Sequence, residues 1–268
     1  MKIGRQAHRR SAICASNADT IIVRGKDLCA DLIGHVGFSD YVWLLITGEM
    51  PGPGQRAVLD STLVAIAEHG FVPSVQASRL TLAAAPEALQ GAVAAGILGC
   101  GSVVLGSSEA AGRFLAEVNA RAGDGAMEAA VREVVGEYRA RKQSIPGYGH
   151  PLHKGHDPRA LRLLEVAAEN GTVGRHIEAA RVAERLLPEL TGKPLAMNVS
   201  GAIPAVLLDA GYPLLALKGV PILARTASLI AHLLEEQQRP LGFVLAHAGA
   251  SAIDYDGEAP VGFVAKEA

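Results

Sequence analysis

Aromatic residues are scarce in this sequence, at 4% of its 268 residues, although hydrophobic residues as a whole make up 49%. Because β-sandwiches depend on aromatic and β-branched side chains, this balance favours helices. Charged residues, at 19%, are too few for a disordered chain of this hydrophobicity. We therefore expect a globular protein, with one large domain or two lobes that share a core.

Cysteine and net charge are also low. Cys14, Cys29 and Cys100 are odd in number and widely spaced, so a disulfide framework is not expected. Reduced thiols are typical of the cytoplasm, which is where we place the protein. The formal net charge of -2 argues against general binding to nucleic acid. An anionic ligand would need a local cluster of basic side chains.

No apolar run has the form of a signal peptide or a clear membrane span. The basic N-terminus, MKIGRQAHRRSAIC, lacks a long apolar stretch. The apolar segment 91–106 is rich in glycine and near the lower length limit for a span, and the segment 201–217 carries Asp209 and two prolines. We interpret both as buried helices and expect no association with a membrane.

Apolar residues recur at helical spacing through most of the chain. In the segment 55–68, Leu59, Leu63 and Ile66 fall at i, i+4 and i+7. A short apolar helix precedes it and ends at a Gly/Pro loop, and the segment 20–25 is a strand candidate in an N-terminal hairpin. The sequence therefore predicts an all-α protein. Helical spacing also predicts helices over 87–98, 108–121, 127–142, 158–169, 176–188, 197–210 and 219–237.

The segment SIPGYGHPLHKGHDPRA, at 144–160, is the most informative part of the chain. Asp157 lies at an N-cap position ahead of Pro158, so a helix is expected to begin there. Gly147 and Gly149 permit backbone geometries closed to other residues and let a ligand approach the main chain closely. Loops with rigid flanks of this kind often carry function.

Three interpretations of this segment are open from spacing alone. His150, His153 and His156 are compatible with metal binding, although no nearby cysteine or HExxH pattern accompanies them. In the second interpretation, His150 is a polarising donor, Arg159 a fork for a carboxylate and Lys154 a point charge for a phosphate. In the third, the segment is a solvated basic loop without a ligand.

Several segments resemble the citrate synthase family in the family's own order. PGYGHPLHKGHDPRA at 146–160 resembles its PG-(F/Y)-GH and DPR signature, whose GxGH part also occurs in citryl-CoA lyases and the C-terminal module of ATP-citrate lyase. The short length is closer to the lyase branch than to full-length citrate synthases. Further resemblance lies in AEHG at 67–70, NVSGAIPAVLLDAG at 198–211 and LARTASLIAHLLEEQQRP at 223–240.

The resemblance implies a citrate synthase-like fold and a homodimer. A large helical domain would comprise residues 1–106 and 212–268, with a smaller helical domain, 107–211, inserted in it. Helix 219–237 is apolar on most faces and is therefore expected to be buried. The family buries the corresponding helix near the two-fold interface.

The resemblance also implies residues that bind substrate. His69 and His150 would contact the carboxylate and the hydroxyl or carbonyl of a bound acid. Arg159 and Arg225 would bind its carboxylates, and Arg239 would reach across from the partner subunit. Coenzyme A, as an acyl-CoA substrate, would lie on a loop, and no metal is required. That loop comprises Pro146, Gly147, Tyr148 and Gly149, with Lys154 near the phosphates.

The sequence departs from the family at two catalytic positions. Leu105 stands at or beside the place of a histidine that binds the thioester oxygen in citrate synthases, and the lyase branch often lacks this histidine as well. Ser200 replaces the aspartate that moves the proton on the acyl carbon. A serine hydroxyl cannot act as a general base without a partner, and Glu109 is the nearest candidate substitute.

Three hypotheses follow. In the first, the protein is a citryl-CoA lyase-like enzyme that cleaves a citryl-CoA-type ester to an acyl-CoA and a 2-oxo acid, or runs the reverse condensation, with His150 and the group at Ser200 as catalytic residues. In the second, it is a catalytically impaired protein that binds CoA esters or carboxylates. In the third, it is a metal-dependent enzyme built on His150, His153 and His156.

Overall fold

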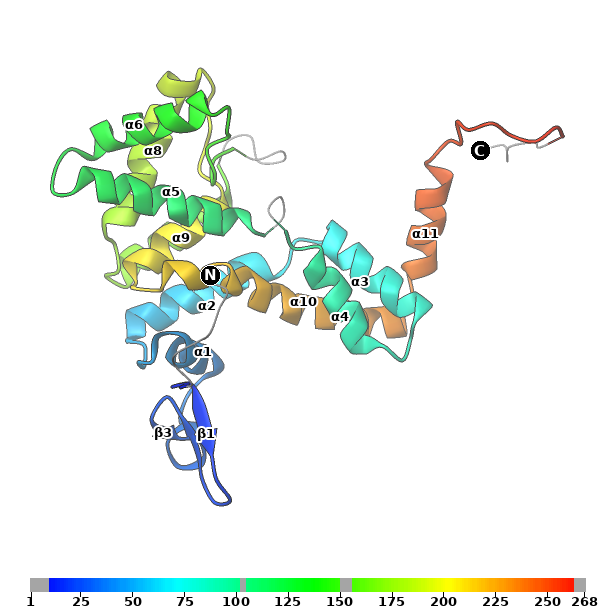
Figure 1. The fold of residues 1–268 in the computed structure, drawn as a ribbon, viewed down its shortest axis with the longest axis horizontal. Helices are drawn as coiled ribbons and strands as arrows, with labels where there is room; N and C mark the ends of the chain where they lie inside the picture. The colour runs from blue at the N-terminus through cyan, green and yellow to red at the C-terminus, as the bar shows by residue number, and fades with distance from the viewer. Residues whose placement is uncertain (1–9, 102–104, 150–155, 263–268) are drawn as a thin grey trace. The chain divides into compact units, whose positions relative to one another are not determined.

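The computed structural model describes residues 10–101, 105–149 and 156–262, and within these ranges the chain is mostly helical (Figure 1). The all-α prediction is confirmed. Three short strands, β1 (Cys14–Ser16), β2 (Ile21–Val23) and β3 (Lys26–Asp27), form an antiparallel sheet in that order, with Val23 opposite both Cys14 and Lys26. The predicted strand at 20–25 is therefore the central strand of this sheet.

The helices follow the apolar spacing closely. Each of the eight predicted segments from residue 55 onward is helical, with ends within three residues of the expected ones. The helices are η1 (Leu28–Leu32), α1 (Phe38–Thr47), α2 (Pro53–Ala67), α3 (Pro73–Ala84), α4 (Leu89–Leu98), α5 (Ser107–Ala122), α6 (Met127–Ala140), α7 (Pro158–Glu169), α8 (Arg175–Thr191), α9 (Val199–Asp209), η2 (Leu214–Ala216), α10 (Gly219–Gln238) and α11 (Gly242–Ser251).

Helices α3 and α11 were not predicted from the sequence. The buried face of α3 carries Ser74, Ser78 and Arg79 among its apolar residues, so the helical period of hydrophobicity is broken. Helix α11 contains two glycines and buries only Gly242. Neither helix therefore has the buried apolar stripe by which an amphipathic helix is recognised in a sequence.

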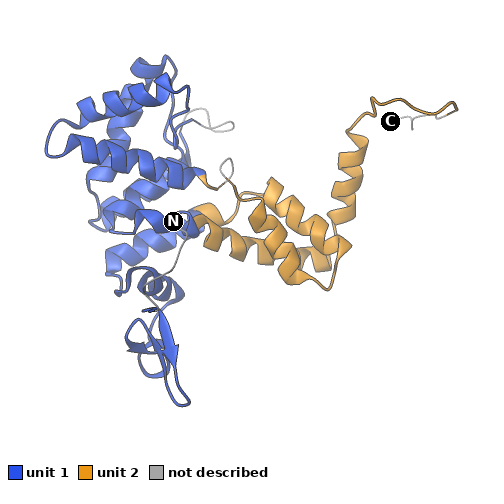
Figure 2. Ribbon diagram, in the orientation of Figure 1, with its two compact units in different colours: residues 1–65, 107–220 blue, residues 66–106, 221–268 orange. Residues whose placement is uncertain are grey.

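The chain forms two compact units (Figure 2), one of residues 1–65 and 107–220 and the other of residues 66–106 and 221–268. The sequence predicts a different division, into a large domain of residues 1–106 and 212–268 and a smaller domain of residues 107–211. The two compact units are groups of residues that contact one another, and they do not test where such domains begin and end. That division stays a prediction.

Helix α9 is the centre of the first unit. It packs against α5, α7 and α8, while α6 packs against α5 and α8. Its residues Ala202, Ile203, Ala205, Val206 and Leu207 are completely buried. Such an all-round apolar helix gains stability from every neighbour, at roughly 25 cal/mol for each Å² of apolar surface removed from water.

The second unit is built from α3, α4, most of α10 and α11. Helix α3 packs against α4 and α11, and Leu82, Ala92 and Leu233 form a small apolar cluster. Leu229 and Leu233 of α10 are completely buried, but Ile230 and Leu234 are 51% and 56% exposed. Within this single chain the expected burial of all faces of α10 is therefore not reached.

One stretch in the described part of the chain, Leu214–Gln238, is long and apolar enough to cross a membrane by length and composition. One such helix is weak evidence for a span, because core helices of soluble proteins pass the same test. The three cysteines of the sequence, Cys14, Cys29 and Cys100, are all free thiols in the structure.

Asp209, at the end of α9, caps the start of α8. Its buried carboxylate accepts hydrogen bonds from the backbone N–H groups of Gly174 (2.8 Å), His176 (2.9 Å) and Ile177 (2.9 Å), and contacts Nδ1 of His176 at 2.8 Å. Burial by itself raises the pKa of Asp209, but the hydrogen bonds from His176 and Ile177 outweigh it and lower the pKa below its ordinary value. The charged form therefore stabilises the fold.

We predict that Asp209→Ala lowers the free energy of unfolding by about 2–3 kcal/mol at pH 7, because three amides at a helix N-terminus lose their acceptor. Since the folded pKa is depressed, this contribution is present above the unfolded pKa and is lost as the pH falls through the folded pKa. Urea titrations followed by circular dichroism, at pH 7 and below pH 4, measure the difference. Asp124→Ala, at a fully exposed carboxylate, is the control.

Candidate functional site

The loop 147–149 is bound along the chain segment that leads into α9. Asn198 caps α9, since its Oδ1 accepts a hydrogen bond from the N–H of Ser200 at 2.9 Å, and its Nδ2 donates to the carbonyl of Gly149 at 2.6 Å. The backbone N–H of Gly149 donates to Ala196 O at 2.7 Å, and that of Asn198 donates to Gly147 O at 3.0 Å. The predicted CoA loop is thus attached to the helix that carries Ser200.

Two glycines allow this close approach. Gly147 has a left-handed φ of 88°, and a Cβ atom added to it would lie 2.7 Å from Cα of Gly201. A Cβ atom on Gly201 would lie 2.5 Å from the carbonyl oxygen of Gly147. Buried Tyr148 fixes the loop on its other side, because its hydroxyl donates to Ala180 O at 2.9 Å and burial raises its pKa. The loop is therefore held by the fold on both sides.

Asp157 places Arg159 beside the same helix. As predicted, Asp157 caps α7, and its carboxylate accepts hydrogen bonds from the N–H, Nε and Nη2 of Arg159 at 3.1, 3.0 and 2.9 Å. It also accepts the N–H of Val199, the first residue of α9, at 2.9 Å. Burial raises the pKa of Asp157, but the bonds from Arg159 and Val199 outweigh it and lower the pKa. Among the described residues Nη1 of Arg159 keeps no partner.

Ser200 contacts a second hydroxyl. Its Oγ accepts a hydrogen bond from Oγ of Ser107, the first residue of α5, at 2.8 Å. Glu109, the candidate substitute for a carboxylate at this position, instead forms an ion pair with Arg113 at 2.7 Å. Two neutral hydroxyls supply no general base near neutral pH. Nearby in sequence, Leu105 is buried and holds a left-handed φ of 68°, which is costly for a residue with a Cβ atom.

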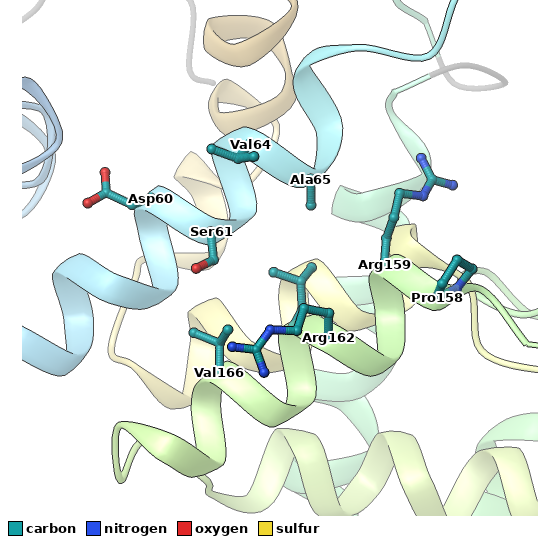
Figure 3. A pocket seen from close by; sticks show the side chains of 9 residues that line it. Asp60, Ser61, Val64, Ala65, Pro158, Arg159, Arg162 and Val166 are labelled. Carbon is teal, nitrogen blue, oxygen red and sulfur yellow. The ribbon is translucent and has the colours of Figure 1, made fainter.

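A cavity of about 530 Å³ lies between α2 and α7 inside the first unit (Figure 3). Its walls are mainly apolar, and Arg159 and Arg162 border it from α7. Arg162 is engaged by Glu165 and Glu169, which leaves Arg159 as the more available cation. The residues that line the cavity are Asp60, Ser61, Val64, Ala65, Pro158, Arg159, Arg162, Leu163 and Val166.

In the second unit Arg225 of α10 is buried without full hydrogen bonding. Its side chain is 2% exposed, and its Nε and Nη1 atoms have no partner among the residues that the structure describes. Burial lowers the pKa of Arg225, whereas the nearby Glu68 and Cys100 act in the opposite direction. His69 lies in the exposed turn after α2. Arg239 follows the end of α10, is mostly exposed and contacts Glu235 at 3.2 Å.

Arg79 of α3 is buried in the same unit but fully paired. It is completely buried, its Nε contacts Glu236 at 2.6 Å and its Nη1 contacts Glu235 at 2.9 Å. Its Nη2 donates to the carbonyl of Arg239 at 3.3 Å, and its guanidinium lies 5.2 Å from the ring of Phe71. Burial lowers the pKa of Arg79, but the bonds to Glu236 and Glu235 outweigh it and raise the pKa.

Comparison with known proteins identifies the family. Residues 51–242 match the family described as Citrate synthase, C-terminal domain. The chain belongs to the citrate synthase family. A putative citrate synthase 2 of Mycobacterium tuberculosis is 31% identical over 195 residues, which cover 70% of this chain and 49% of that protein. The chain thus spans about half the length of the curated relatives it matches, and the predicted family resemblance is confirmed.

Two solved structures share the fold over nearly the whole chain. Citryl-CoA lyase from Hydrogenobacter thermophilus is 31% identical, with a TM-score of 0.84, over 95% of this chain and 97% of that one. ATP citrate lyase from Methanothrix soehngenii, solved with citrate and coenzyme A, is 22% identical, with a TM-score of 0.79, over 98% of this chain and 44% of that one. The second likeness concerns the fold alone.

The structure brings some of the predicted site residues of this citrate synthase family member together and leaves others undescribed. The loop 146–149, Arg159 and Ser200 all lie around the start of α9 in the first unit, whereas His69, Arg225 and Arg239 lie in the second. His150, His153 and Lys154 lie outside the described residues. In the ranges that are described, no group of three or more His, Cys, Asp or Glu side chains has a metal-binding arrangement.

Three residues of the site were missed in the sequence. Ser107 lies 93 positions from Ser200, and no local pattern links the two hydroxyls. Glu68 contacts α10 across about 160 positions. Asn198 had a usable signal, because asparagine directly before an apolar helix is a favoured N-cap.

We predict that Gly201→Ala destabilises the protein by about 1–3 kcal/mol, because the new Cβ atom would overlap the backbone of Gly147. Gly136→Ala, on a helical glycine of α6 with open space around its Cβ position, is the matched control and should stabilise by about 0.5–1 kcal/mol. Thermal unfolding of the two variants beside wild type checks both signs. Equal effects of the two changes would contradict the close approach.

Proposed function

We propose that this protein binds a CoA ester together with a di- or tricarboxylic acid, and that it cleaves a citryl-CoA-type ester to an acyl-CoA and a 2-oxo acid or runs the reverse condensation. The observation that carries the proposal is the buried, incompletely bonded guanidinium of Arg225. The fold likeness to citryl-CoA lyase along nearly the full length of both chains supports the lyase branch.

Arg225 is costly to the protein unless an anion binds it. Burial without hydrogen-bond partners disfavours a charged group by several kcal/mol, on the order of 1–3 for each orphaned donor. Guanidinium groups bind carboxylates in a bidentate geometry, either through Nε with Nη2 or through Nη1 with Nη2. A carboxylate of the bound acid on either side would restore one of the missing bonds. In this proposal Arg225 binds the acid.

Further residues have roles in acid binding that the family resemblance suggests. His69 and His150 contact the carboxylate and the hydroxyl or carbonyl of the acid, and Arg159 binds a second carboxylate through its available Nη1. Asp157 supports this role, since its two bonds to Arg159 fix the plane of the guanidinium. Arg239 acts across a dimer from the partner subunit, which is consistent with its exposure beyond the end of α10.

Coenzyme A lies on the loop 146–149 in this proposal, with Lys154 near its phosphates. The backbone of this loop is fixed by Asn198, Gly201 and Tyr148, so it needs no reordering to bind. The group is a substrate here, as an acyl-CoA, and the thioester makes the acyl carbon acidic. No metal is needed for this chemistry.

Cleavage then requires two proton movements. His150 removes the proton of the tertiary hydroxyl, the carbon–carbon bond breaks to give the 2-oxo acid, and the electrons of the bond pass to the acyl-CoA as an enolate. A proton delivered at the acyl carbon completes the acyl-CoA. In this proposal Ser200, which is hydrogen-bonded to Ser107, stands in for the family's aspartate in that step, and the arginines hold the acid in position.

The Ser200–Ser107 pair also supports the second candidate, a protein that binds CoA esters or carboxylates without turnover. Two hydroxyls stand where the family has an aspartate, and general acid–base groups contribute about 10²–10⁴-fold to rate. The binding residues are unaffected by this change. Turnover of citryl-CoA, measured beside binding of CoA, separates the two candidates.

We also propose that the protein is a cytoplasmic homodimer. Ile230 and Leu234 of α10 are half-exposed, and Phe243 and Val244 of α11 are exposed further still. Exposed apolar side chains of this size on neighbouring elements of one unit are typical of a subunit interface. A dimer would bury the apolar side chains of α10 that this single chain leaves exposed.

We predict that Arg225→Met weakens binding of oxaloacetate at least 30-fold, equivalent to about 2 kcal/mol, because the acid loses a desolvated partner. The same change should leave the free energy of unfolding equal or raise it by about 1–3 kcal/mol, since a buried unpaired charge is removed. Arg79→Met is the matched control, because its removal leaves Glu235 and Glu236 uncompensated and should cost about 3–5 kcal/mol. Calorimetry and urea denaturation measure the two quantities. Arg225→Met that unfolds as Arg79→Met does would contradict a ligand role.

We predict that Ser200→Asp raises the turnover of citryl-CoA about tenfold or more, because it supplies the missing acid–base group at the acyl carbon. The measurement is release of acyl-CoA and 2-oxo acid from citryl-CoA, with Ser107→Ala as the control that removes the neighbouring hydroxyl without adding a carboxylate. Slower turnover in Ser200→Asp than in wild type would assign the serine to a different chemistry. Binding of CoA without turnover in either form would favour the binding protein.

A further inference from the structure

From Arg225 onward, one side of α10 carries polar residues as far as the residue after the helix. Arg225, Ser228, His232, Glu235 and Arg239 follow one another at alternating intervals of three and four residues, so they share one face of the helix. The two arginines proposed to bind acid stand at the two ends of this stripe. Its middle is occupied by residues that no step of the proposed function uses.

Glu68, directly after α2, binds the middle of this stripe. Its Oε2 accepts a hydrogen bond from Oγ of Ser228 and lies 3.0 Å from Nε2 of His232. Its Oε1 accepts the backbone N–H groups of His69 at 2.9 Å and of Gly70. One carboxylate therefore joins the turn that carries His69 to the face of α10 that carries Arg225, one helical turn before Ser228.

The position of Glu68 is not explained by helix stability or by packing. A carboxylate at the C-terminal end of a helix is disfavoured by the helix dipole. The side chain is 51% exposed, so it contributes little to a core. Burial acts to raise the pKa of Glu68, but the bonds from Ser228, from the N–H of Gly70 and from His232 outweigh it and lower the pKa. The contacts thus hold a charged carboxylate in one place.

We propose that Glu68 is a positioning residue of the acid site: it fixes the backbone of His69 against α10, so that His69 and Arg225 act on the same acid. This inference rests on the proposed acid binding by His69 and Arg225. The charge of Glu68 has the opposite effect, because it offsets the positive charge of Arg225 and repels an anion. The position of the carboxylate oxygens and their charge can therefore be separated by substitution.

Two substitutions on the full chain make the test. Glu68→Gln keeps an oxygen for the amides of His69 and Gly70 but removes the charge, and Glu68→Ala removes both. Isothermal calorimetry measures the dissociation constants of oxaloacetate and, separately, of CoA. We expect Glu68→Ala to raise the dissociation constant of oxaloacetate about tenfold or more and to change that of CoA by no more than about twofold. Glu68→Gln should bind oxaloacetate at least as tightly as wild type.

Glu87→Ala is the control, because Glu87 is an exposed acid in the loop between α3 and α4 of the same unit and its loss makes the same change in net charge. Ser228→Ala removes the hydrogen bond from α10 to Glu68 and should also weaken the binding of oxaloacetate. Wild-type affinity for oxaloacetate in Glu68→Ala overturns the inference alone. Equal loss of oxaloacetate and CoA binding, or Glu68→Gln as weak as Glu68→Ala, overturns it too. A wild type that binds CoA but not oxaloacetate overturns the acid site itself, and this inference with it.

Discussion

The approach of two backbones at Gly147 and Gly201 is the constraint on which the first unit depends. With no Cβ atom on either residue, the loop 147–149 lies directly on the start of α9, and Asn198 bonds to both. Asp157 adds α7 to the same point through Val199, and Ser107 adds α5 through Ser200. Segments distant in sequence thus meet at the N-terminus of α9. The rest of this helix is buried, so its packing fixes the positions of the segments that contact it.

Two buried arginines in the second unit differ in how far the chain itself compensates their charge. Arg79 has two carboxylates, a carbonyl and an aromatic ring as partners, so its charge is compensated in the chain itself. Arg225 is equally buried, but two of its donors are without partners in the described part of the chain. Buried charges without partners are rare because they are costly, which is why Arg225, and not Arg79, carries the proposal of acid binding.

The sequence predicts local features well and long-range ones poorly, for physical reasons. Apolar spacing located most helices, and Asp157 before Pro158 gave the start of α7 correctly, because a cap and its helix are neighbours in the chain. Helix α3 was not predicted, because Arg79 and two serines interrupt the apolar spacing of its buried face. The bonds of Glu68 to α10 and of Ser107 to Ser200 join residues far apart in sequence, and only the folded chain brings them together.

The four leading amides of α9 have a consequence for the recognition of phosphate. Helix N-termini commonly bind anions through their free N–H groups. Here the carboxylate of Asp157 accepts a hydrogen bond from the N–H of Val199, and the side chain of Asn198 accepts one from the N–H of Ser200. The carbonyl oxygen of Asn198 accepts the N–H groups of Gly201 and Ala202. None of the four is left for a ligand. The N-terminus of α9 therefore offers no free amide to an anion, and a phosphate-bearing ligand of the kind proposed above would be held by groups other than these four amides, such as cationic side chains whose attraction depends on ionic strength.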